Sequence, residues 1–246
     1  MQRLISFILI CFAAEQLSAQ GFPTLERILL PVFAGPSPGA FGSLWTSELW
    51  IYNDDDEPAG VGYLFPPDTG QIAPKSSRSG VGNGPGYSPA RFITVLASQA
   101  PRLQFNLRIR DLSRQAQTAG TEIPVVRESK FRSGRVILLN VPIDARFRQT
   151  LRLYEFLETG QRPGSVLVRF FRIGSPPDAL VHEEGLTLAG PSSVVAYAQL
   201  GPFPPELFDA STVRIEIEPV TPNMRYWGFV SITNNETQHV TTVTPQ

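Results

Sequence analysis

The sequence predicts an all-β protein made of two tandem antiparallel β-sandwiches that follow an N-terminal export signal. Three observations predict this class. Residues 102–110 and 213–218 alternate polar and apolar side chains, the period of a strand with one buried face and one wet face. Turn formers are frequent, with 20 Gly and 23 Pro among 246 residues. No segment keeps a helical period, and half-wet strands are typical of antiparallel sheets.

The first nineteen residues have the layout of a secretory signal. Arg3 supplies the basic start, residues 4–14 form the apolar run, and Ala19 places a small residue before the expected cleavage point. A membrane anchor needs about twenty continuous apolar residues, whereas this run ends at Glu15. We therefore expect a protein exported to the periplasm or the exterior, with no transmembrane segment in the mature chain.

Cys11 is the only cysteine of the chain, and it lies inside the signal. It does not match a lipid-attachment cysteine, because it follows Ile10 within the apolar run and not a small residue at its end. The mature chain is therefore expected to be free of cysteine. This excludes thiol catalysis, disulfides and cysteine metal sites, so core packing has to stabilise the fold.

The strands of the first half are bounded by clusters of turn residues. The clearest is the alternating run, in which Leu103, Leu107 and Ile109 share one face. Sixteen Phe residues and many Val and Ile supply the apolar side chains for such faces. The predicted strands are 27–33, 46–53, 60–65, 91–97, 102–110, 122–127 and 135–141.

The second half repeats this density of short strands. Residues 213–218 place Val213 and Ile215 on one face and Arg214 on the other. About seven strands per hundred residues predict immunoglobulin-like sandwiches. The predicted strands are 149–156, 165–173, 180–188, 193–200, 212–218, 225–233 and 238–244.

The two halves contain a weak internal repeat. Residues 46–52 and 149–154 are each followed by a polar turn and a second apolar strand. Aligning Leu49 with Leu151 also aligns Tyr52 with Tyr154. This match predicts two related sandwiches.

We expect the first sandwich to span residues 22–143 and the second to span residues 144–246, with the junction at 142–146. Residues 66–90 are rich in Gly, Ser and Pro, which predicts a long exposed loop within the first domain.

The residues that catalysis usually needs are scarce, so we assign no catalytic residue and no resident cofactor. The mature chain has two histidines, His182 and His239, and His182-Glu183 lacks the second histidine of a zinc-protease helix. A net charge of −1 gives no sign of a nucleic-acid partner.

The sharpest polar cluster is Asp54, Asp55 and Asp56. Aspartate is a common turn residue, so a solvated turn is the simpler interpretation. The alternative is a calcium site, because calcium prefers several carboxylate oxygens; the run lacks the spaced Asp-x-Asp-x-Asp-Gly pattern.

Aromatic residues at alternate strand positions predict a candidate ligand-binding face. If Leu49 faces the core, Trp50 and Tyr52 lie on the opposite face of their strand, and Trp227 with Phe229 forms a similar pair. Such pairs stack against sugars, bind protein partners at the cell surface, or pack between domains.

Residues 225–246, and more loosely residues 41–53, resemble uncharacterised exported β-sandwich proteins of environmental bacteria such as Acidobacteria. The resemblance implies a bacterial source and an exported sandwich, and it carries over no functional residue. The expected function is a non-catalytic structural or binding module of the bacterial envelope or surface. One alternative is a carbohydrate-binding module that uses the sheet-face aromatics.

Two further alternatives stay open. A pilus-chaperone-like assembly factor is also an exported pair of immunoglobulin-like domains; it predicts a cleft lined by Arg146, Arg148 and Arg152 and an edge strand at 103–109. A hydrolase of unrecognised type predicts His182 or His239 in a cleft beside a carboxylate and a hydroxyl.

Overall fold

The computed structural model describes most of the chain after the predicted signal. The described residues are 24–62, 70–81 (Val81 by its backbone alone), 90–115, 117–158, 160–174, 176–190, 195–203, 207 and 211–245. The predicted export signal at 1–19, with Cys11, lies outside them. Within the described part, no helix has the length and apolar character that crossing a membrane requires.

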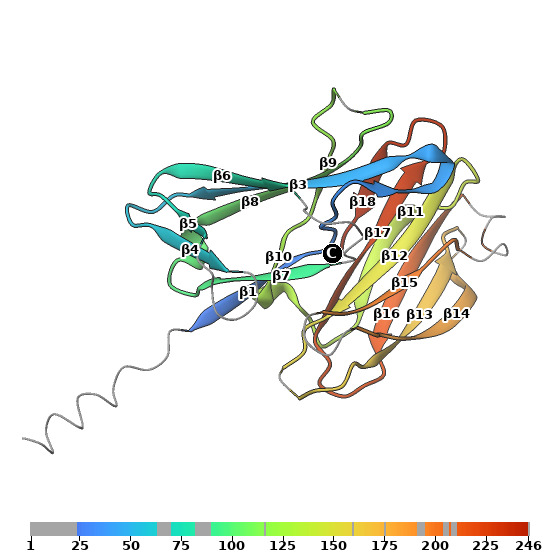
Figure 1. The fold of residues 1–246 in the computed structure, drawn as a ribbon. Coiled ribbons are helices and arrows are strands. Elements are labelled where there is room, and N and C mark those ends of the chain that lie inside the picture. Colours follow the sequence, from blue (N-terminus) through green and yellow to red (C-terminus); the bar gives the residue numbers. More distant parts are fainter. Residues whose placement is uncertain are drawn as a thin grey trace, which may run out of the picture.

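The strands that precede residue 128 form two antiparallel sheets, which we call the first half (Figure 1). Sheet A has the order β10-β1-β7-β4-β5, and sheet B has the order β2-β3-β8-β9 with β6 paired beside β3. Sheet A contains β1 (Leu25–Leu30), β4 (Ala59–Gly62), β5 (Gly70–Ile72), β7 (Arg91–Leu96) and β10 (Val126–Arg127). Sheet B contains β2 (Ser37–Pro38), β3 (Leu44–Asn53), β6 (Ser76–Val81), β8 (Leu103–Asp111) and β9 (Thr121–Ile123).

The remaining strands form the second half, again as two antiparallel sheets. Sheet C has the order β15-β12-β17-β18, and sheet D has the order β11-β16-β13-β14. Sheet C contains β12 (Phe147–Glu155), β15 (Ala196–Leu200), β17 (Tyr226–Asn234) and β18 (Val240–Val243). Sheet D contains β11 (Val136–Pro142), β13 (Ser165–Arg172), β14 (Ala179–Thr187) and β16 (Thr212–Pro219).

The two halves have the same strand order. Sheet A without β10 reads β1-β7-β4-β5, and sheet D reads β11-β16-β13-β14 in equivalent positions. Sheet B without β2 reads β6-β3-β8-β9, and sheet C reads β15-β12-β17-β18. The register agrees too, because Leu49 of β3 pairs with Leu107 and its equivalent Leu151 of β12 pairs with Val230. The internal repeat in the sequence therefore corresponds to two copies of one topology.

This topology shares only some strand neighbours with the immunoglobulin order. The second and fifth strands pair in each half, and so do the third and sixth, as in immunoglobulin domains. The first strand, however, lies beside the sixth, and the seventh lies beside the second. The all-β antiparallel class is as expected, and the immunoglobulin likeness stays a prediction.

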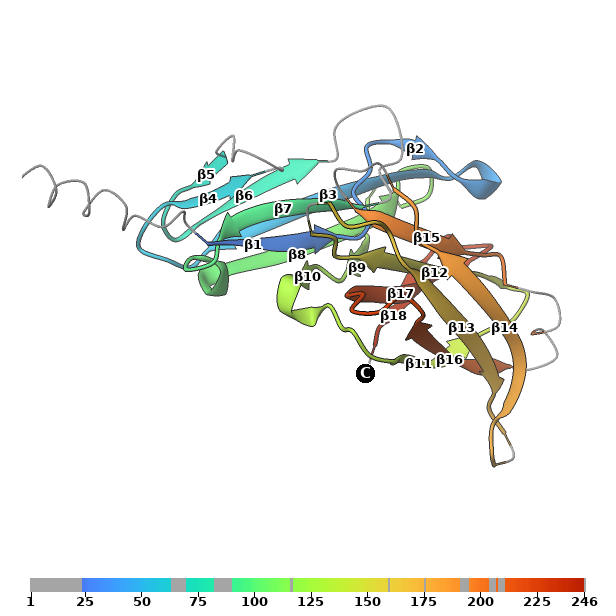
Figure 2. The same ribbon diagram turned by 90° about the horizontal axis from the view of Figure 1, so that it is seen from below.

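Sheet C is covered on both faces. Leu151, Leu153 and Ile232 point toward sheet D and belong to the core of the second half. The alternate residues Tyr154, Trp227 and Phe229 point the other way and belong to the same hydrophobic cluster as the core of the first half. Sheet C therefore lies between sheet D and the first half. The first and second halves lie against each other in both views (Figures 1 and 2).

Three segments differ from the sequence-based expectation. Strands β5 and β6 lie within 70–81, inside the range expected to be a loop, and the rest of that range lies mostly outside the described residues. The strand expected at 122–127 is two strands, β9 and β10, which belong to different sheets. Strand β11 precedes the expected domain boundary at 143–144, yet it pairs with β16 of the second half.

Candidate binding faces and the junction between the halves

The outer face of sheet B carries the exposed aromatic residues predicted from the sequence. Trp50 is 44% exposed, and its indole Nε1 donates a 2.9 Å hydrogen bond to Oε1 of Glu48 on the same strand. Tyr52 follows two residues later and is half-buried. Because alternate residues of a strand share a face, Glu48, Trp50 and Tyr52 form one row along β3.

Polar residues surround this row. On β8, Asn106 lies opposite Trp50 and Gln104 lies opposite Tyr52. On β6, Ser79 and Ser77 occupy the corresponding positions. The outer face of sheet B therefore carries two aromatic rings among hydrogen-bonding side chains.

The equivalent face of sheet C carries large aromatic residues where sheet B carries polar ones. Tyr154 is the equivalent of Tyr52, but it lies opposite Trp227, not opposite a glutamine. Trp227 is only 7% exposed, and its ring centroid lies 6.3 Å from that of Tyr154 and 5.4 Å from that of Phe229. Trp227 thus belongs to the junction between the halves and not to an exposed face. Packing between domains is one of the alternatives that the sequence predicts for this residue.

Tyr154 is the central residue of this junction. It is 1% exposed, and its Oη donates a 2.6 Å hydrogen bond to the carbonyl oxygen of Pro31 in the first half. The bond satisfies a hydroxyl that burial would otherwise leave at a cost of about 1–3 kcal/mol. Tyr154 therefore joins the halves both by the contacts of its ring and by the hydrogen bond of its hydroxyl.

A second part of the junction is built around Phe156. Its ring packs against Phe92 of the first half and against Phe131 of the segment between β10 and β11, with centroids 5.7 Å and 5.4 Å away. The guanidinium of Arg27 lies 3.5 Å from the centroid of the Phe156 ring, and that of Arg225 lies 4.6 Å from it. Both arginines also form ion pairs with Glu128. Cations over an aromatic face add to the apolar contact.

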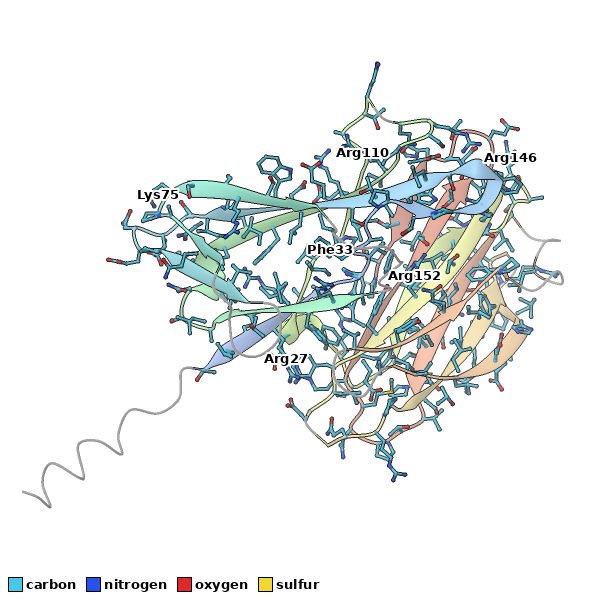
Figure 3. All side chains as sticks on the ribbon, in the orientation of Figure 1. Arg27, Phe33, Lys75, Arg110, Arg146 and Arg152 are labelled. Atoms are coloured by element: carbon cyan, nitrogen blue, oxygen red, sulfur yellow. The ribbon has the colours of Figure 1, made fainter. Side chains whose placement is uncertain are left out.

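A cavity of about 220 Å³ lies between the halves, and Phe229 of the aromatic contact around Tyr154 lines it. One wall is the outer face of sheet C, including Arg148, Thr150 and Arg152 of β12. The opposite wall comes from the first half and includes Trp45 and Ile109. Figure 3 shows Arg152 in the space where the two halves meet.

Arg148 is held by neutral groups. Its guanidinium donates to Oδ1 of Asn235 at 3.0 Å and to Oε1 of Gln238 at 2.9 Å. Burial and the nearby charge of Arg114 lower the pKa of Arg148. The side chain makes no ion pair with a carboxylate of the described residues.

The aspartate turn at 54–56 is organised around a lysine. The ammonium Nζ of Lys75 lies 3.5 Å from Oδ1 of Asp54 and 3.5 Å from Oδ1 of Asp56, and it donates to the backbone carbonyl of Asp54. Asp55 instead accepts a hydrogen bond from the backbone of Asp56. Across the part of the chain that is described, no group of three or more His, Cys, Asp or Glu side chains could hold a metal ion. The arrangement favours the solvated-turn interpretation over calcium.

The two histidines lie apart from these sites. His182 on β14 has its ring 5.7 Å from that of Phe170, and its Nε2 is 3.6 Å from Oε2 of Glu184. His239 is exposed in the turn between β17 and β18. Neither lines the cavity between the halves, so the placement expected for a hydrolase is not found at that cavity.

The features expected of a chaperone-like factor are present only in part. Arg148 and Arg152 line the cavity, whereas Arg146 is exposed and forms a 2.9 Å ion pair with Asp144 (Figure 3). Strand β8 is not an edge strand, because it pairs with β3 along its length and with β9 over Leu107–Ile109. The alternation of residues 103–109 reflects a central strand with one face in the core.

No direct signal for the cavity is present in the amino-acid sequence. Arg148 and Arg152 are four residues apart and so share one face of a strand, but nothing in the pattern identified the face that the first half covers. No protein-family model, curated protein or solved structure matches the chain.

Proposed function

We propose that the protein is an exported, non-catalytic binding module of the bacterial envelope or surface, and that it holds a carbohydrate chain on the outer face of sheet B. One observation carries the proposal: Trp50 stays exposed at a position where its indole is held in place by Glu48. An ordered aromatic ring loses little conformational freedom when a sugar ring stacks on it.

The surroundings of Trp50 suit such a ligand. Asn106, Gln104 and Ser79 supply hydrogen-bond donors and acceptors for hydroxyl groups on either side of the aromatic row. The row of side chains along β3 and its neighbours offers an extended contact, which suits a polymer more than a compact molecule. The comparison with sheet C supports this, because a face meant to dock a sandwich has Trp227 and Phe229 where sheet B has Gln104 and Asn106.

The proposal is tested by retention on polysaccharides. The purified mature protein is passed through native gels that contain soluble β-glucan or xylan, and it is sedimented with cellulose, chitin or peptidoglycan. We expect retention by at least one of these polymers and a loss of about tenfold or more in affinity for Trp50→Ala.

The matched control is Leu180→Ala, which removes an apolar side chain of similar exposure from sheet D. It is expected to leave retention unchanged. Equal losses in both variants, or no retention on any polymer of the panel, would contradict a carbohydrate face on sheet B.

A further inference from the structure

The cavity between the halves has the composition of a ligand site. Its apolar lining includes Trp45, Ile109 and Phe229, and its hydroxyls come from Thr150 and Ser231. Among the described residues that line it there is no Asp or Glu, whereas Arg148 and Arg152 both line it. A concave apolar site with a few convergent polar groups is the usual form of a small-molecule pocket.

The charge of Arg148 is not balanced by a carboxylate among the described residues of the cavity wall. Arg148 is partly buried and donates only to neutral amide oxygens, and the further positive charge of Arg114 disfavours its protonated form. A partly desolvated cation without a carboxylate partner is costly, and an anion beside it would lower the free energy.

The lining also limits which anion fits. Each terminal nitrogen of Arg148 donates one hydrogen bond, so three of the five N–H groups of its guanidinium remain for a ligand. Two carboxylate oxygens need fewer donors than the three oxygens of a phosphate group. The apolar wall opposite β12 suits a carbon skeleton attached to that group.

We propose that the cavity between the halves binds an organic carboxylate, with the carboxylate beside Arg148 and the apolar stem against Trp45 and Ile109. This site is separate from the outer face of sheet B, because none of Glu48, Trp50 and Tyr52 lines the cavity. Each site can therefore be lost without the other.

The test is isothermal titration of the full mature protein with hexanoate, hexanamide and inorganic phosphate as probes. We expect saturable binding of hexanoate, and binding of hexanamide weaker by at least about tenfold, since a charge-assisted bond to guanidinium is lost. Phosphate is expected to bind weakly, because it lacks the apolar stem.

Variants locate the site. Arg148→Gln and Arg152→Gln are each expected to weaken hexanoate binding by about tenfold or more. Arg146→Gln is the matched control, since it removes the same charge from an exposed position outside the cavity. It is expected to leave the affinity unchanged.

Several results would overturn the proposal. These are no hexanoate binding, equal affinity for hexanoate and hexanamide, tighter binding of phosphate, or an equal loss in Arg146→Gln. The comparison of hexanoate with hexanamide uses the unaltered protein, so it decides the matter even if Arg148→Gln fails to fold. Retention on polysaccharides is measured separately and does not depend on this outcome.

Discussion

The hydroxyl of Tyr154 donates a 2.6 Å hydrogen bond to the carbonyl oxygen of Pro31, which joins the central strand pair of sheet C to the segment that follows β1. The two residues are far apart in the sequence and lie in different halves of the molecule. The bond is buried, so it acts together with the aromatic contact around Trp227 and Phe229. The halves are therefore expected to unfold together.

Tyr154→Phe is expected to lower the free energy of unfolding by about 1–2 kcal/mol, because it leaves the Pro31 carbonyl without this donor. Urea denaturation followed by circular dichroism measures the change. The control is Tyr52→Phe at the equivalent, half-exposed position of the first half, where we expect less than about 0.5 kcal/mol. Two separate unfolding transitions in the unaltered protein would contradict the joint unfolding.

The two aromatic positions singled out in the sequence are expected to respond differently to truncation. Trp227→Ala removes a buried ring from the junction and should cost about 3–5 kcal/mol. Trp50→Ala removes an exposed ring and should change stability by less than about 0.5 kcal/mol. Thermal unfolding of both variants measures the contrast, and similar losses would show that Trp50 also has a structural role.

Asp111 ties the end of β8 to the start of β3. Burial raises the pKa of this carboxyl, but hydrogen bonds from Ser113, from the backbone of Leu44 and from Arg114 outweigh burial and hold the pKa below its ordinary value. A lowered folded-state pKa means that the carboxylate stabilises the fold above about pH 3.9, the unfolded value, and that this contribution is lost as the pH falls through the folded value.

Asp111→Asn should therefore cost about 1–3 kcal/mol at neutral pH, and this cost should shrink in acid. Urea denaturation at several pH values between neutral and strongly acidic measures both effects. The control is Asp56→Asn in an exposed turn, where the cost should stay below about 0.5 kcal/mol. A cost that does not depend on pH would contradict the assignment.

Glu155 gives the opposite pH dependence. Burial raises the pKa of its carboxyl, although the backbone N–H of Gly164 donates a 2.8 Å hydrogen bond to it. The folded state then binds the proton more tightly, so stability falls as the pH rises from about 4.3, the unfolded value, to the raised folded value.

Glu155→Gln keeps the acceptor for Gly164 and removes the charge. Relative to the unaltered protein, its free energy of unfolding should rise as the pH increases through that window and stay constant above it. Denaturation at matched pH values measures the difference. Glu122→Gln at an exposed position should change stability by less than about 0.5 kcal/mol. A constant difference for Glu155→Gln across the pH range would argue against a raised pKa.

Strands with alternating polar and apolar residues were predictable because one face of the strand meets the core and the other meets solvent. Residues 102–110 and 213–218 correspond to β8 and β16 within one residue at each end. Strand β6 was missed since Ser76–Val81 has no apolar alternation, and its backbone pairing with β3 carries no sequence signal. Strand β5 was hidden by its shortness.

The candidate sites were predictable only in part, because the pattern along one strand does not show what packs against it. The period of two correctly placed Trp50 and Tyr52 opposite the core, but it could not tell an outer face that is covered from one that is exposed. That difference between Trp50 and Trp227 depends on contacts between distant segments, such as Tyr154 with Pro31. The cavity with Arg148 and Arg152 depends on the same long-range packing.

Because the two halves share one topology, equivalent positions can be compared directly between them. One scaffold appears twice, and the outward residues of its seventh strand, Gln104 and Asn106 in one copy and Trp227 and Phe229 in the other, separate a solvent-facing surface from an internal joint. The two copies therefore differ in whether this strand face belongs to the junction or is open to solvent. Substitutions on the open face can accumulate without altering the contacts among Tyr154, Trp227 and Phe229.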